Sequence, residues 1–172
     1  MQQKYHLDDH TTFRLAEPQD SALILEFVRD LAEYEKLLDA VKATEEGFKK
    51  YIFDEKKAEV IIAEYDEKPA GFALYFHTFS TFVGRPGIYL EDLFVKPEYR
   101  GKGLGKTLLT FLAKIAVDRN CGRLEWACLD WNEPSIQFYK SQGANPLSEW
   151  TTYRVSGDAL ADLGAKFPKE LQ

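Results

Sequence analysis

The sequence contains little cysteine and no apolar run long enough to cross a membrane. Its 172 residues include two cysteines, Cys121 and Cys128. On one strand their odd spacing would place the side chains on opposite faces, which argues against a disulfide and leaves free thiols, typical of a reducing compartment. Residues 1–10 are polar and lack the apolar segment of a signal peptide. We therefore expect a soluble, cytoplasmic protein with no membrane partner and a flexible N-terminus over residues 1–10.

Positive charge is also scarce. The chain carries 22 Lys and Arg against 28 Asp and Glu, a formal net charge of −6. Because binding to nucleic acid depends on neutralising phosphates with Lys and Arg, we expect no nucleic-acid partner. An acidic protein is better suited to a cationic substrate, although a net charge of −6 is equally an ordinary aid to solubility. His6 and His10 have no third ligand near them in the sequence, so no metal site is expected.

Length and patterning favour a single domain over residues 1–172. The hydrophobic content of 45% is enough for a sizeable core, and the sequence contains no repeat or linker. Alternating apolar or β-branched residues predict strands at 11–16, 58–65, 70–79, from 88 onward, at 123–129 and at 150–155. Helical spacing predicts helices at 17–34, from 44, up to 118 and from about 130 to 143, with a short one at 157–164. About six strands with about four helices indicate an α/β or α+β fold.

The stretch from Ile88 to Gly105 organises the rest of the chain. It predicts a strand interrupted by two carboxylates, then a glycine-rich turn, then the N-terminus of a helix. Such a turn points backbone N–H groups at one spot and favours an anion there. Arg100, Lys102 and Lys106 add positive charge around it. We interpret this turn as a phosphate cradle.

Spacing excludes two familiar phosphate loops. The end of a Walker A motif is imitated at Gly105-Lys106-Thr107, but the place of the first glycine is taken by Arg100. A Rossmann motif that begins at Gly101 finds lysine instead of glycine at its sixth place. The pattern that fits every place is Arg-x-x-Gly-x-Gly over residues 100–105.

That pattern resembles the coenzyme A loop of the GNAT family of N-acetyltransferases, and the resemblance extends beyond the loop. Further blocks between Thr12 and Val155 are similar, in the family's order, to the diamine (spermidine/spermine) acetyltransferases and their thialysine acetyltransferase relatives. These blocks are Leu31-Ala-Glu-Tyr-Glu35, Tyr89-Leu-Glu-Asp92, Tyr99-Arg-Gly101, Trp131-Asn-Glu-Pro-Ser135, and Phe138-Tyr-Lys140 with Gly143-Ala144. The resemblance implies the GNAT fold, a central and mostly antiparallel mixed sheet of about six to seven strands flanked by about four helices. It also implies a homodimer.

The resemblance further implies acetyl-CoA as co-substrate and assigns its contacts. The residues expected to hold the pyrophosphate are Arg100, Gly101, Lys102, Gly103, Leu104, Gly105 and Lys106. The residues whose backbone is expected to bind the pantetheine arm and polarise the thioester carbonyl are Leu93, Phe94 and Val95. In this family the strand bulges at that point and separates from its neighbour. The remaining expected contacts with coenzyme A are Asn132, Glu133, Pro134 and Ser135.

Acetyl transfer to an amine also needs two proton transfers. A primary amine with a pKa near ~10.4 is charged at neutral pH, and the leaving thiolate must be protonated. By resemblance, Tyr139 is the general acid, and Glu91 takes the amine proton directly or through water. Strand alternation puts Glu91 and Asp92 on opposite faces, so only one of them need face the substrate. The residues implied to line the amine site are Tyr34, Glu35, Glu91, Asp92, Glu125, Trp126 and Ala127.

The expected function is acetyl-CoA-dependent N-acetylation of a primary amine on a small polyamine-like or diamine-like cation, by direct transfer. Departures from the diamine branch keep alternatives open. Phe82 stands near the place where that branch has a tryptophan, and Leu129-Asp130-Trp131 is closer to the thialysine acetyltransferases. The alternatives are acetylation of a lysine-like amino acid such as thialysine, acetylation of protein lysines, and a coenzyme A binding regulatory module without turnover. The presence of both Glu91 and Tyr139 argues against the module.

Overall fold

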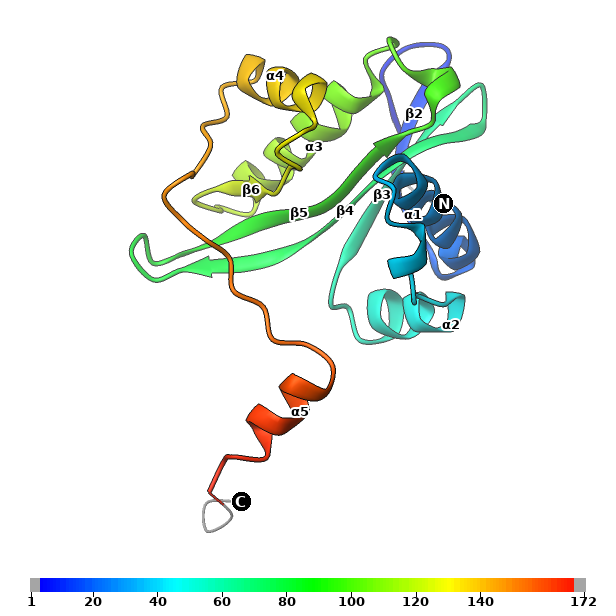
Figure 1. The fold of residues 1–172 in the computed structure, drawn as a ribbon. Coiled ribbons are helices and arrows are strands. Elements are labelled where there is room, and N and C mark those ends of the chain that lie inside the picture. Colours follow the sequence, from blue (N-terminus) through cyan, green and yellow to red (C-terminus); the bar gives the residue numbers. More distant parts are fainter. Residues whose placement is uncertain (1–3, 169–172) are drawn as a thin grey trace. The chain divides into compact units, whose positions relative to one another are not determined.

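The computed structural model describes residues 4–168 and divides into two compact units, residues 1–127 and residues 128–172. We call these the N-terminal unit and the C-terminal unit. The N-terminal unit holds the described strands and the helices α1 to α3, and the C-terminal unit holds α4 and α5 (Figure 1). The single domain expected over residues 1–172 stays a prediction.

The elements follow the predicted order closely. The described strands are β1 (Lys4–His6), β2 (Thr11–Leu15), β3 (Glu59–Tyr65), β4 (Lys68–Ser80), β5 (Arg85–Val95) and β6 (Leu124–Trp126). The described α-helices are α1 (Ser21–Tyr34), α2 (Glu45–Phe48), α3 (Leu104–Asp118), α4 (Glu133–Ser141) and α5 (Asp158–Gly164). Shorter helical turns are η1 (Pro18–Asp20), η2 (Leu38–Ala40), η3 (Lys49–Asp54) and η4 (Pro97–Tyr99).

The described strands form one mixed sheet in the order β1-β2-β3-β4-β5-β6. Neighbouring strands are antiparallel from β1 to β5, and β6 runs parallel to β5. The sheet is therefore mostly antiparallel with one parallel edge, which confirms the fold class predicted from the sequence.

Helices cover both faces of this sheet (Figure 1). One face packs against α1 through a buried cluster in which the rings of Phe27 and Phe72 stack with centroids 5.2 Å apart. The buried members of that cluster are Ile24, Phe27, Ile52, Val60, Ile62, Phe72, Leu74 and Phe94. The other face packs against α3, whose Leu104, Leu108 and Leu112 recur at every fourth position and are fully buried. Each such side chain contributes about 1.5–3 kcal/mol by leaving water.

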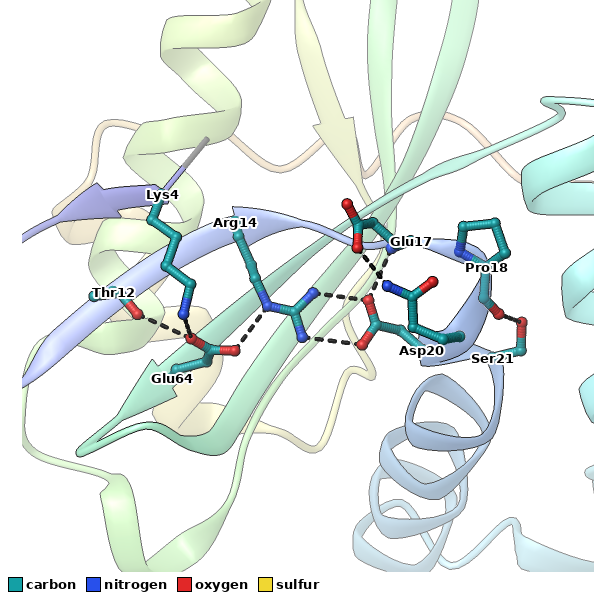
Figure 2. A network of polar contacts seen from close by, with 9 residues as sticks. Lys4, Thr12, Arg14, Glu17, Pro18, Asp20, Ser21 and Glu64 are labelled. Carbon is teal, nitrogen blue, oxygen red and sulfur yellow. Dashed lines mark hydrogen bonds and ion pairs between the residues drawn. The ribbon is translucent and has the colours of Figure 1, made fainter. Parts of the chain in front are cut away.

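A polar network fixes the first strands to the start of α1 (Figure 2). The Arg14 guanidinium donates to both carboxylate oxygens of Asp20, at 2.7 and 2.9 Å, and its Nε donates to Glu64 at 2.7 Å. Lys4 and Thr12 donate to the other oxygen of Glu64, at 2.9 and 3.1 Å. Asp20 also accepts from the backbone N–H of Glu17. Nearly every charge in the network therefore has an opposite charge as its partner.

The pairing of β1 with β2 corrects one prediction about the N-terminus. Residues 4–6, expected to belong to a flexible segment, pair with β2 in the register Lys4–Arg14, Tyr5–Phe13 and His6–Thr12. All three residues are exposed, so the strand shows no apolar alternation for sequence reasoning to detect. The rest of the expected flexible segment includes His10, whose Nδ1 lies 2.6 Å from a carboxylate oxygen of Asp66. Met1 to Gln3 lie outside the described residues.

One later strand was predicted too long, and another was predicted wrongly. The strand expected over 123–129 is limited to Leu124–Trp126, and the strand expected over 150–155 is not formed in the described chain. Residues 150–155 have strand-forming side chains but are exposed, and β propensity stabilises a strand only when a neighbouring strand supplies pairing and packing.

The connection between the strands predicted at 70–79 and from 88 onward is shorter than expected. The hairpin turn occupies residues 81–84, and Pro86 and Gly87 belong to β5, opposite Phe79 and Thr78. Glycine is required at 87, because a Cβ there would lie 2.8 Å from the Thr78 hydroxyl. Pro86 and Gly87 therefore lie where two strands approach each other closely, although such residues are more typical of a loop.

Candidate active site

The central strand β5 contains a bulge at Glu91. Leu90 lies opposite Tyr75 of β4, and Asp92 lies opposite the next residue, Leu74, so Glu91 is an extra residue between two pairs. On the other side of β5, the described ladder with β6 ends at the pair of Leu90 and Trp126. Among the described strands, β5 is therefore paired on both sides from Ile88 to Leu90 and with β4 alone beyond Leu90. Bulges of this kind often re-aim side chains beside functional sites.

Beyond the bulge, β5 presents backbone groups to its open edge. The N–H of Lys96 donates to the carbonyl of Ala70 in the β4 direction, at 2.9 Å. Because backbone groups alternate in direction along an antiparallel strand, those of Phe94 also face β4, and those of Leu93 and Val95 face the open edge. Two of the three residues predicted to bind the pantetheine arm thus direct their amides outward. Phe94 instead places its side chain in the core.

The glycine-rich turn after β5 forms an uncapped helix N-terminus. Gly101 and Gly103 have φ of 77° and 84°, a left-handed conformation that favours glycine. Within residues 4–168, no side chain caps α3 at Gly103, and the first helical hydrogen bond comes from the N–H of Thr107. The N–H groups of Leu104 to Lys106 therefore point out of the helix end, where the helix dipole favours an anion.

Two cations flank this helix end on opposite sides. The Arg100 guanidinium lies 5.0 Å from the ring centroid of Tyr34 and 5.7 Å from that of Phe94, and its Nε donates to the carbonyl of Val95 at 3.0 Å. The Lys102 ammonium lies 4.5 Å from the ring centroid of Tyr65. Backbone donors, a helix N-terminus and exposed cations together fit a diphosphate group such as that of coenzyme A.

Asp92, next to the bulge, lies near two other carboxylates, Glu91 and Glu35. Asp92 lies on the sheet face that packs against α1, in line with Phe94. Burial, reinforced by the negative charges of Glu91 and Glu35, raises the pKa of Asp92 to about 6. Burial also raises the pKa of Glu35. Asp92 is therefore the member of the pair whose proton affinity is brought toward neutral pH, which suits a general base.

This finding sharpens the prediction made for Glu91. Sequence reasoning placed Glu91 and Asp92 on opposite faces by assuming a regular strand, and the bulge removes that regularity. Glu91 is exposed at the bulge, whereas Asp92 is partly buried. No pattern of residue types marks a bulge in this stretch, so sequence reasoning could not choose between the two carboxylates.

A groove of about 420 Å³ lies beside these carboxylates. Its lining residues are Asp30, Glu33, Tyr34, Phe94, Lys96, Pro97, Glu98 and Arg100. Three of these were predicted site residues, namely Tyr34, Phe94 and Arg100. The lining residues that sequence reasoning missed are Asp30, Glu33, Lys96, Pro97 and Glu98. Helical spacing could have revealed two of them, because Asp30 and Glu33 lie within one turn before Tyr34 on α1. The charged side chains that line the groove are the carboxylates of Asp30, Glu33 and Glu98 and the cations of Lys96 and Arg100.

The predicted β6 residues lie next to the bulge. Glu125 is opposite Tyr89 and Trp126 is opposite Leu90, with Ala127 directly after the strand. Glu125 forms an ion pair with Arg123, with 2.7 Å between Oε2 and Nε. A substrate ammonium would therefore have to compete with Arg123 for Glu125.

The remaining predicted residues belong to the C-terminal unit. Asn132 is the N-cap of α4, and its side-chain oxygen accepts from the N–H of Ser135. Glu133 and Pro134 form the first turn of α4. Tyr139 lies on the same helix, with its ring centroid 5.3 Å from that of Phe138. The contacts of these residues with coenzyme A, and the acid role of Tyr139, stay predictions.

Residues 4–168 lack a membrane-spanning helix and a metal-binding cluster. None of the helices described there has the length and apolar character needed to cross a bilayer. The same residues contain no group of three or more His, Cys, Asp or Glu side chains that could hold a metal ion. Cys121 and Cys128 do not form a disulfide, as expected, and the Cys128 thiol donates to the carbonyl of Leu129 at 3.7 Å.

Comparison with known proteins identifies the class. Residues 24–144 match the acetyltransferase (GNAT) family, and the chain belongs to that family. A thialysine N-epsilon-acetyltransferase from Sus scrofa is 39% identical over 165 residues, which cover 89% of this chain and 96% of that protein. The spermidine/spermine N(1)-acetyltransferase-like protein 1 from Homo sapiens is 33% identical over 166 residues, covering 90% of this chain and 24% of that protein.

A solved structure agrees with this assignment. An integron cassette protein from the mobile metagenome of V. cholerae superposes with a TM-score of 0.76 at 30% identity, covering 91% of this chain and 99% of that one. The predicted family, fold and enzyme class are thus confirmed, and the chain is an N-acetyltransferase that acts on amines. The family match spans parts of both units.

Proposed function

We propose that the enzyme transfers the acetyl group of acetyl-CoA directly to a primary amine of a small cationic substrate. The observation that carries this proposal is the continuity of β5 with the glycine-rich turn. Within about fifteen consecutive residues, the chain contains a carboxylate pair, an open strand edge and an uncapped helix N-terminus, in that order. These are the parts that amine binding, carbonyl polarisation and diphosphate binding require.

Acetyl-CoA supplies the reaction with an acetyl thioester, and the chain supplies positioning and proton transfer. The N–H groups of Leu104 to Lys106 would hold the diphosphate, with Arg100 and Lys102 beside it. The outward amides of Leu93 and Val95 would bind the pantetheine arm and donate to the thioester carbonyl oxygen. That donation stabilises the negative charge which develops on this oxygen as the amine attacks.

Two protons move during the transfer. The substrate ammonium gives one proton to Asp92 or Glu91, directly or through water, which frees the nitrogen lone pair. The new C–N bond then forms as the C–S bond breaks. The phenol of Tyr139 would give a proton to the leaving sulfur. Neither cysteine lies at the site in this proposal, so no acyl-enzyme is expected.

A second candidate substrate class is a lysine-like amino acid. The relatives named thialysine N-epsilon-acetyltransferase support it. The groove itself adds a physical reason, because Lys96 lines it together with Asp30 and Glu33. An amino acid carries an α-carboxylate that needs a cation, whereas a diamine or polyamine has only ammonium groups. The cytoplasmic location and the lack of a nucleic-acid partner are proposed from the composition of the sequence, and the homodimer is proposed from the family resemblance alone.

An amine panel tests the proposal. Purified enzyme is mixed with acetyl-CoA and spermidine, putrescine, thialysine or lysine, and thiol release is followed. We expect release with at least one of them, and faster release with thialysine than with the diamines if Lys96 binds the substrate carboxylate. Absence of release with all four would sink the small-amine proposal.

The Tyr139→Phe variant tests the acid role separately. It should lower turnover about tenfold or more while coenzyme A binding stays close to that of the wild-type enzyme. An unchanged turnover would remove Tyr139 from the proton transfer without affecting the rest of the proposal.

A further inference from the structure

Arg100 belongs to two predicted sites at once. In sequence it is the first residue of the phosphate loop, but its guanidinium lies over Tyr34, a residue of the amine site. Its Nε also donates to the carbonyl of Val95, on the strand edge where the pantetheine arm is expected. One side chain therefore contacts the groove, the strand edge and the phosphate loop.

These contacts compete with the phosphate for Arg100. A guanidinium over an aromatic ring gains about 0.5–1 kcal/mol at an exposed site, whereas a bidentate pair with a phosphate is charge-assisted and stronger. Arg100 is exposed, so its rotation is not blocked by packing. A diphosphate at the N-terminus of α3 would draw the guanidinium away from the rings of Tyr34 and Phe94.

We propose that Arg100 is a positioning residue that couples the two substrate sites: it covers Tyr34 in the groove until the diphosphate of coenzyme A binds it, and its departure opens the groove to the amine. The inference rests on the proposed function, since it needs both substrates. It predicts that coenzyme A and the amine each tighten the binding of the other, because coupling between two ligands is reciprocal.

The second loop cation provides an internal control. Lys102 lies over the ring of Tyr65, just as Arg100 lies over that of Tyr34. Tyr65 does not line the groove, which is bordered by α1 and by the segment from Phe94 to Arg100. Releasing Lys102 from its ring can therefore change coenzyme A binding, but it should leave the effect of coenzyme A on the amine unchanged.

The decisive experiment is a double-mutant cycle on the dissociation constant of coenzyme A, measured by titration calorimetry. Tyr34→Leu removes the ring that holds Arg100, so coenzyme A should bind about two- to fivefold more tightly. Tyr34→Phe keeps the ring and should match the wild-type affinity for coenzyme A. In an Arg100→Gln background, Tyr34→Leu should have no effect, because the competing contact is already gone.

A second measurement uses the wild-type protein alone. Spermidine and thialysine are titrated with and without saturating coenzyme A, and the amine that binds should bind about two- to fivefold more tightly with it. This gain should disappear in Arg100→Gln and persist in Tyr65→Leu. A purely structural role of Arg100 would lower both affinities without removing the dependence of one on the other.

The outcomes separate this inference from the proposed function. Unchanged or weaker coenzyme A binding in Tyr34→Leu, together with independent binding of the two substrates to the wild-type enzyme, would overturn the coupling while leaving acetyl transfer intact. Failure to bind coenzyme A at all would instead overturn the proposed function. If Tyr34→Leu does not fold, the wild-type titrations still decide the question.

Discussion

Two acidic clusters in the N-terminal unit differ in how their charges are balanced. In the network at the start of α1, burial is the largest influence on Asp20 and Glu64 and acts to raise the pKa of each. Hydrogen bonds and positive charge from Arg14, together with the Glu17 N–H at Asp20 and Lys4 at Glu64, outweigh burial, and both pKa values are lowered. Beside the β5 bulge, burial acts on Asp92 without a cation to oppose it, and the neighbouring charges of Glu91 and Glu35 add to the increase in pKa.

The difference separates a structural cluster from a functional one. Carboxylates whose charges are matched within the protein stabilise the fold and have little capacity left for a ligand. Carboxylates held near one another without a cation destabilise the fold, and they gain most from a cationic partner that arrives from solution. The first cluster should thus respond to mutation mainly in stability, and the second mainly in activity.

The largest effect is expected from Asp92→Asn. This change removes a proton acceptor without changing shape, so kcat/KM should fall by about 10² to 10⁴-fold. Steady-state kinetics with the amine identified by the panel measures it. The matched control is Glu91→Gln, which we expect to have a smaller effect. If Glu91→Gln lowers kcat/KM more than Asp92→Asn does, the base is Glu91 as first predicted.

Breaking the structural cluster should have the next largest effect. Arg14→Met leaves Asp20 and Glu64 as partly buried carboxylates without their main cation, and should lower the free energy of unfolding by about 3 kcal/mol. Denaturant titration at pH 7 gives this value. The variant should keep its kcat/KM at a temperature where it is folded. A stability loss below about 1 kcal/mol would mean that the network is no more than an exposed set of ion pairs.

The two clusters should also respond to pH with opposite signs. The raised pKa of Asp92 means that its ionisation opposes folding, a cost that is absent below its ordinary pKa of 3.8 and complete above about 6. Asp92→Asn should therefore be more stable than the wild-type protein by about 3 kcal/mol at pH 8 and equally stable near pH 3.5. Asp20 and Glu64 have lowered pKa values, so their contribution is present above their ordinary values and is lost as pH falls through the lowered ones.

Thermal melts of both proteins at the two pH values check this prediction. A stability difference that is the same at pH 8 and pH 3.5 would show that Asp92 is not the group that titrates. Activity gives a parallel test, because a general base must be ionised, and kcat/KM should decline below about pH 6.

The smallest effect is expected at the exposed end of the network. Lys4 pairs with Glu64, but its side chain is 43% exposed, so Lys4→Gln should cost less than about 1 kcal/mol. Lys114→Gln is a control, because Lys114 forms an exposed pair with Asp118 on α3 and anchors no strand. Hydrogen exchange of the β1 amides should increase in Lys4→Gln alone. Equal exchange in both variants would show that β1 is held by its backbone pairing.

The phosphate loop could be predicted from the sequence because its chemistry depends on residue type at fixed spacing. Cations at 100, 102 and 106 around glycines at 101 and 103 would repel one another unless an anion lay between them, and the structure gives both glycines positive φ. The helices α1 and α3 were equally predictable, since their buried positions recur with the helical period.

Features that depend on pairing could not be predicted in the same way. The bulge at Glu91 is a property of how β5 and β4 align, and neither strand alone reveals it. The same holds for β1, whose exposed residues carry no pattern, and for residues 150–155, whose pattern finds no strand partner in the described chain. The position of Asp92 depends on how these strands align, so the detailed arrangement of the site could not be predicted from the sequence alone.

The bulge has a consequence for how activity can be gained or lost in evolution. Leu90 and Asp92 face neighbouring residues of β4, so deleting the single codon for Glu91 would leave every other residue of β5 with its present partner. The sheet would lose an irregularity and keep its ladder. A protein that lacks this one residue should still fold, but its β5 edge should no longer open beyond Leu90. The number of residues in β5, as well as their type, is therefore an inherited determinant of catalysis in this chain.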